Sequence, residues 1–115
     1  MSDTHDFAAK CLWNAGKGLP EVERSTSYGT FAVKVRGKLM ARVKDADTVV
    51  LACPAEEKEL LKEAAPDIYF ETPHYHGYPL ILARIRVIAD DELANRLRIA
   101  WRMMAPAKLQ KASPV

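Results

Sequence analysis

The stretch TFAVKVRGKLMARV, residues 30–43, decides the fold because its apolar side chains recur at every second position. A period of two is typical of a strand with one face on a core, and the glycine at Gly37 interrupts it as a turn does. The stretch therefore predicts a β-hairpin around RGK, residues 36–38. The residues expected to face the core are Phe31, Val33, Val35, Leu39, Ala41 and Val43.

Further strands are predicted on the C-terminal side of this hairpin. KDADT, residues 44–48, has turn composition and leads into the apolar run VVLAC, residues 49–53. DIYF, residues 67–70, indicates a short strand, and LILARIRVI, residues 80–88, indicates a longer one that alternates again. Its inward residues are expected to be Ile81, Ala83, Ile85 and Val87.

Three segments have the periodicity of helices. Residues 7–16 carry apolar positions at helical spacing and end in a glycine, and residues 54–65 begin with a proline followed by glutamates. ADDELANRLRIAWRMMAP, residues 89–106, carries one apolar stripe that includes Trp101. The predicted order is α-β-β-β-α-β-β-α, an α+β fold with an antiparallel sheet and helices on one face.

The composition indicates one domain. A chain of 115 residues with 49% hydrophobic and 28% charged residues is typical of a globular protein. We expect the domain to span residues 1–107 and residues 108–115 to form a mobile tail. The start of the chain resembles no signal peptide and no apolar run approaches the length of a membrane span, so a cytoplasmic protein is expected.

A basic sheet face is the most coherent functional feature of the sequence. The net charge of +2 is small, so any polyanion site depends on where the charges lie. Strand alternation projects six cations opposite the core, where they would suit a phosphate backbone. Two alternatives remain open: a solvated face balanced by Asp45 and Asp47, or a protein-binding face that includes Met40, Leu80 and Leu82. The six cations are Lys34, Arg36, Arg42, Lys44, Arg84 and Arg86.

TPHYHGYP, residues 72–79, is the second notable feature. His74 and His76 offer two imidazoles, but zinc needs three or four protein ligands, and no ligand spacing accompanies them. We therefore expect no metal. The stretch instead predicts a rigid turn that presents His74, Tyr75 and His76 beside the last strand, with Tyr75 and Tyr78 near the rim for base stacking.

Recognisable catalytic and cofactor motifs are absent from the sequence. There is no GxSxG elbow and no glycine-rich nucleotide loop, so neither an enzyme nor a cofactor is expected. The two cysteines, Cys11 and Cys53, belong to no metal-binding or disulfide pattern.

Several stretches together resemble the MmcQ/YjbR-like family, over nearly the whole chain from Phe7 to Lys108. The resemblance implies a small α+β domain with a curved antiparallel sheet, similar to type III secretion chaperones and, more distantly, to frataxin-like proteins. It also implies DNA binding, the label commonly given to family members, and no established catalytic residues. The stretches are STSYGTFAVKVRGKLMARV, PAEEKELL, FETPHYHGYPLILARI and AWRMMAP.

The sequence thus predicts a non-enzymatic, cytoplasmic module that binds nucleic acid, with DNA the expected partner. The competing hypothesis is a chaperone-like adaptor that uses the same face for a protein partner or a homodimer. The residues predicted to bind nucleic acid are Lys34, Arg36, Arg42, Lys44, Arg84, Arg86, His74, Tyr75 and His76.

Overall fold

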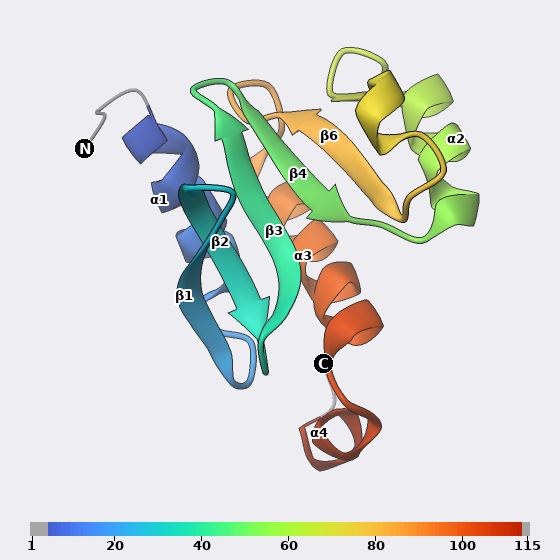
Figure 1. Cartoon of the computed structure of the whole chain (residues 1–115). Helices are drawn as coiled ribbons and strands as arrows, with labels where there is room; N and C mark the ends of the chain where they lie inside the picture. Colours follow the sequence, from blue (N-terminus) through green and yellow to red (C-terminus); the bar gives the residue numbers. More distant parts are fainter. Residues whose placement is uncertain (1–4, 114–115) are drawn as a thin grey trace.

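The computed structural model describes residues 5–113 and has the predicted α+β fold. Its centre is a curved six-stranded sheet in the order β1-β2-β3-β4-β6-β5, in which every neighbouring pair is antiparallel (Figure 1). The short hairpin connections between β1 and β4 favour this arrangement, since antiparallel neighbours need only tight turns. The strands are β1 (Val22–Ser27), β2 (Thr30–Val35), β3 (Lys38–Asp45), β4 (Thr48–Ala52), β5 (Tyr69–Phe70) and β6 (Leu80–Arg84).

Two long helices cover one side of the sheet, which we call the inner face. Helix α1 contacts β2 and β3, and α3 contacts β3 and β4, so both lie behind the sheet in Figure 1. Helix α2 contacts the other end of the sheet at β5 and β6. The helices are α1 (Asp6–Gly16), α2 (Ala55–Ala64), α3 (Asp90–Met104) and α4 (Ala107–Ala112), with a 3-10 turn, η2 (Pro73–Tyr75).

The main hydrophobic core lies between this inner face and the helices. One cross-strand row runs through Val33, Ala41, Leu51 and Ile81, which are all fully buried. Trp101 of α3 packs in the same core and its indole N–H donates to the carbonyl of Pro20 at 2.9 Å. The alternation in the sequence thus reports the inner face correctly along most of its length.

Two elements, β1 and α4, were not predicted from the sequence. Residues 22–27 form the edge strand β1, although their sequence VERSTS contains only one apolar residue. An edge strand gains ladder hydrogen bonds without burying alternate side chains, so it leaves no hydrophobic pattern. Residues 107–112 form α4 where a mobile tail was expected, because Leu109 is buried and the Gln110 amide donates to the carbonyls of Arg102 and Ala105. The predicted domain and tail also include residues 1–4 and 114–115, which lie outside the described residues.

The predicted register of β3 is wrong at its start. The β2–β3 register shifts between Val33 and Lys34, and Met40 and Ala41 are both buried in the main core. Leu39 consequently pairs with Lys34 on the opposite, outer face. An extra residue in a strand produces this shift, and simple alternation cannot foresee it. Val87, expected to face inward, is exposed because β6 ends at Arg84.

Candidate functional site

A pocket opens on the outer face of the sheet. The residues Val50, Tyr75 and Leu82 form a small second cluster there, packed with Phe70 and Leu80. Beside this cluster lies a recess of about 410 Å³, which we call the aromatic pocket. It combines side chains from a hairpin turn, three strands (β3, β4 and β6) and the loop that contains η2. Its lining residues are Tyr28, Leu39, Arg42, Val50, His74, Tyr75, Tyr78 and Leu80.

Arg42 is the charged group of the aromatic pocket, and three contacts hold its guanidinium. Nη2 donates to the Tyr75 hydroxyl at 2.5 Å, and Nη1 donates to the carbonyl of Val43 at 3.2 Å. The guanidinium carbon also lies 5.0 Å from the ring centroid of Tyr28, within cation–π range. The cation is therefore oriented before any ligand arrives.

Tyr28 occupies an unusual backbone position. It forms with Gly29 the two-residue turn between β1 and β2, and both residues have positive φ, 53° and 79°. Such turns favour Asn-Gly, because a bulky residue in the left-handed region is strained. The tyrosine is nevertheless 87% exposed, so burial in the core does not account for its presence.

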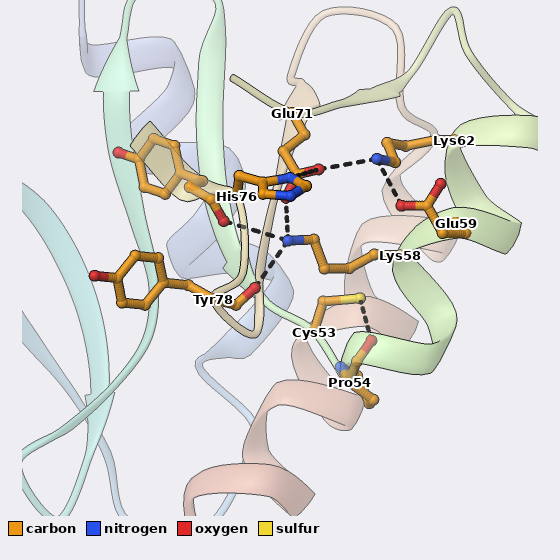
Figure 2. A network of polar contacts seen from close by, with 9 residues as sticks. Cys53, Pro54, Lys58, Glu59, Lys62, Glu71, His76 and Tyr78 are labelled. Carbon is orange, nitrogen blue, oxygen red and sulfur yellow. Dashed lines mark hydrogen bonds and ion pairs between the residues drawn. The ribbon is translucent and has the colours of Figure 1, made fainter. Parts of the chain in front are cut away.

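A buried ion pair fixes the loop that carries His74, Tyr75 and Tyr78. Lys58 of α2 is 5% exposed, and its ammonium group donates to the carboxylate of Glu71 and to the carbonyls of Tyr75 and Tyr78 at 3.3 and 2.8 Å. Figure 2 shows this lysine reaching from the helix to Glu71 and Tyr78. These three bonds match the three donors of an ammonium group, so the loop is anchored to α2.

Glu71 is the negative centre of this anchor. Hydrogen bonds from Lys58, and from Lys62 at 2.9 Å, lower the pKa of the Glu71 carboxyl to about 2. His76 lies at the rim with its Nδ1 3.7 Å from Glu71 Oε1, and its side chain is exposed. Neither Lys58 nor Glu71 was predicted as a site residue, because a lysine in a charged helix is usually solvated and only the fold buries this one.

Four of the six predicted cations lie on or beside the outer face. Arg42 lines the pocket, and Lys34 pairs with Leu39, another lining residue. Lys44 follows on β3, with its Nζ 4.0 Å from Asp45 Oδ2. Arg84 covers the ring of Phe70 at 4.2 Å and donates to the carbonyls of Pro66 and Asp67.

The other two cations were misplaced. Arg36 lies in the β2–β3 turn with φ of 50° and forms an ion pair with Glu21. Arg86 lies beyond the end of β6, where it bonds to Asp47 at 2.6 Å and covers the ring of Phe7 in α1 at 4.6 Å. The predicted alternation runs past the ends of β2 at Val35 and of β6 at Arg84, so the six cations do not share one face.

The aromatic residues were only partly anticipated. Tyr78 is 60% exposed at the pocket, whereas Tyr75 is buried and its ring lies edge-on to His74 at 4.9 Å. Tyr75 therefore positions Arg42 and is not open for stacking. Tyr28 was missed as a site residue, although its place directly before Gly29 in a hairpin turn was a usable signal.

Residues 5–113 contain no cluster of three or more His, Cys, Asp or Glu side chains suitable for a metal ion. None of the helices in these residues has the length and apolarity needed to cross a bilayer. Burial raises the pKa of the thiols of Cys11 and Cys53, so both are poor nucleophiles at neutral pH.

Comparisons with known proteins agree with this fold. An uncharacterized protein of Mycobacterium tuberculosis, Rv2570, and one of Mycobacterium bovis, Mb2600, are each 43% identical over 47 residues. That match covers 41% of this chain and only 36% of each mycobacterial protein. The crystal structure of Deinococcus radiodurans protein DR2400, a DUF419 domain, superposes with a TM-score of 0.71 at 17% identity over 89% of this chain and 81% of that one. The sequence model of the YjbR family matches residues 17–103, so the chain belongs to the YjbR family.

Proposed function

We propose that this protein binds nucleic acid, DNA in the first instance, through the outer face of its sheet and without catalysing a reaction. The observation that carries the proposal is the aromatic pocket, where the exposed rings of Tyr28 and Tyr78 line the same recess as the cation of Arg42, with Tyr28 in cation–π range of it. Aromatic side chains next to cations are the usual means of binding single strands, since rings stack on bases while cations neutralise phosphates.

The positive charge around the pocket supports the proposal. Lys34 and Arg84 lie on or beside the same face as Arg42, and Lys44 follows farther along β3 with its Nζ 4.0 Å from Asp45 Oδ2. Arg36 and Arg86 form closer ion pairs with Glu21 and Asp47. Each phosphate contact contributes about 0.9 to the slope of log affinity against log salt on duplex DNA and about 0.7 on a single strand. Four phosphate contacts therefore give a slope of about −4 at its steepest, which is a weaker salt dependence than that of a strongly basic protein.

Fluorescence anisotropy with labelled single- and double-stranded oligonucleotides, at about 50 and 200 mM salt, tests the proposal. The double variant Lys34→Glu/Lys44→Glu is expected to weaken binding strongly and to flatten the salt dependence. Arg98→Glu/Lys108→Glu is the matched control, because it makes the same charge change on exposed residues of α3 and α4. The absence of binding at about 50 mM salt would refute the proposal.

A protein-binding adaptor is the second candidate function, and the apolar floor of the pocket favours it. Leu39, Val50 and Leu80 line the recess. The apolar strip is smaller than the sequence predicts, because Met40 and Leu82 are fully buried. A protein partner, or a second copy of this chain, would bind with little salt dependence. Failure of the oligonucleotide experiment would direct attention to this alternative.

A further inference from the structure

We propose that the aromatic pocket receives one unpaired nucleotide, with its base against the tyrosines and its phosphate at Arg42, so that the protein distinguishes single strands from duplexes. Insofar as the nucleotide belongs to a nucleic-acid strand, this inference rests on the proposed function. The basic face binds any phosphate backbone, whereas the pocket admits an unpaired base and excludes a paired one. A free mononucleotide has the same chemistry as one unit of a strand, and the experiment separates the two sources.

The size and lining of the pocket suit such a ligand. A volume of about 410 Å³ lies within the range of small-ligand sites, which are typically mostly apolar with a few fixed polar groups. Leu39, Val50 and Leu80 supply an apolar floor, and Tyr28, Tyr78 and His74 contribute rings at the walls. A planar base can bury one face on such a floor and stack on such rings.

Arg42 gives the pocket its preference for an anion. Of the five N–H donors of a guanidinium, two are used by the hydroxyl of Tyr75 and the carbonyl of Val43. Because these bonds and the ring of Tyr28 fix the plane of the group, little rotamer entropy remains to be lost when a phosphate binds. The ion pair of Lys58 with Glu71 fixes the opposite wall in the same way, through the carbonyls of Tyr75 and Tyr78.

The exposure of Tyr28, at a backbone position that does not favour a bulky residue, supports a role for its ring. A non-glycine residue with φ of 53° in a tight hairpin is strained, and asparagine would relieve the strain. The ring is almost fully exposed, so the fold gains little from it. Its contribution lies in the aromatic pocket, where it meets Arg42.

The position of the pocket explains the preference for an unpaired base. In a duplex both faces of a base are covered by its neighbours and its edge is paired, so it cannot reach a recess walled by a turn and a loop. Enzymes that act on bases take them out of the stack for the same reason. A single strand presents its bases without this cost.

The experiment compares one labelled single strand of mixed sequence with its own duplex, for the native protein, Tyr28→Asn, Tyr28→Phe and Lys34→Glu/Lys44→Glu. Asparagine keeps the turn and removes the ring, whereas phenylalanine keeps the ring and removes only the hydroxyl. We expect the native protein to prefer the single strand, Tyr28→Asn to lose about tenfold in affinity for it, and Tyr28→Phe to retain it. Equilibrium dialysis with thymidine 5′-monophosphate forms a separate arm.

The outcomes separate the two proposals. Equal affinity for strand and duplex, unchanged by Tyr28→Asn while Lys34→Glu/Lys44→Glu weakens both, would overturn the pocket inference and leave the proposed function standing. Binding of the mononucleotide without any binding of the strand would assign the pocket to a free nucleotide and overturn the proposed function. No binding of strand, duplex or mononucleotide would overturn both.

Discussion

The two faces of the sheet differ in what their side chains do. The inner face is covered by α1 and α3, and its residues belong to one continuous core with Trp101 at 0% exposure. The outer face is covered only in part, by the loop of residues 71–79 over the cluster of Val50, Tyr75 and Leu82. The inner face therefore supplies most of the stability, and the uncovered part of the outer face is where recognition can occur.

The same contrast appears in the two hairpin turns. Tyr28 and Arg36 both precede a glycine in a two-residue turn and both have positive φ. The side chain of Arg36 is satisfied by Glu21, whereas the ring of Tyr28 lies over the pocket. The same type of positive-φ turn thus carries a local ion pair in one hairpin and part of the candidate site in the other.

The largest expected effect is on the inner face. Trp101→Ala removes a fully buried ring and its hydrogen bond to Pro20, and we expect it to lower the free energy of unfolding by about 4 kcal/mol. Tyr78→Ala on the outer face is the control and is expected to change it by at most about 0.5 kcal/mol. Urea denaturation of both variants measures the difference, and similar losses would contradict the division of roles.

The next effect concerns the anchor of the outer loop. Lys58→Met leaves the buried Glu71 carboxylate with Lys62 as its remaining lysine partner, and we expect a loss of about 3 kcal/mol. Lys62→Met is the matched control, with a loss of about 1 kcal/mol, because Lys62 is more exposed and Lys58 still satisfies the carboxylate. Chemical denaturation gives both values. A Lys58→Met variant as stable as the native protein would show that the loop needs no anchor.

Acid should weaken the same anchor. The pKa of Glu71 is about 2 in the folded chain and about 4.5 in the unfolded one, so the unfolded state takes up the proton first as pH falls. The stability that Glu71 contributes is complete above pH 4.5 and is lost as the pH falls toward 2. We expect the native curve of stability against pH to fall more steeply in this window than that of Glu71→Gln. Parallel curves would mean that the carboxylate is not held by the lysines.

The smallest effect has the opposite sign. Tyr28→Asn places a residue that tolerates positive φ in the turn, and we expect it to stabilise the protein by about 0.5 to 1 kcal/mol. Tyr28→Phe keeps the strain and should leave stability unchanged. Thermal unfolding measures both. A destabilised Tyr28→Asn variant would mean that the exposed ring serves the fold rather than a ligand.

The fold was largely predictable because burial on one side of a strand leaves a period of two in the sequence. The α+β class, the long hairpin of β2 and β3 and the helix around Trp101 are confirmed. Strand β1 was not predicted because its sequence VERSTS contains one apolar residue, whereas β5, at the opposite edge, contains Tyr69 and Phe70 and was predicted. The bulge at Met40 was not predicted because a register shift depends on the partner strand.

The candidate site was less predictable than the fold. Alternation placed Lys34 and Arg42 on the outer face, but Lys44 lies at a register shift between Val43 and Asp45. It also carried Arg36 and Arg86 past the ends of their strands. The burial of Tyr75 depends on Leu82 and on Val50, and Val50 lies on another strand far from it in the chain. Side chains that meet only through long-range packing leave no local pattern to detect.

The sequence by itself determined the fold class, the family resemblance and the inner core, because these follow from local periodicity and from motifs that are contiguous in the chain. Only the tertiary structure decided that Tyr28, Arg42 and Tyr78 share one pocket and that Lys58 anchors its wall. The physical reason is the pairing of strands and the packing of loop 71–79 on the sheet. They bring together groups separated by up to 50 residues and remove Lys58 from water, which no short stretch of sequence encodes.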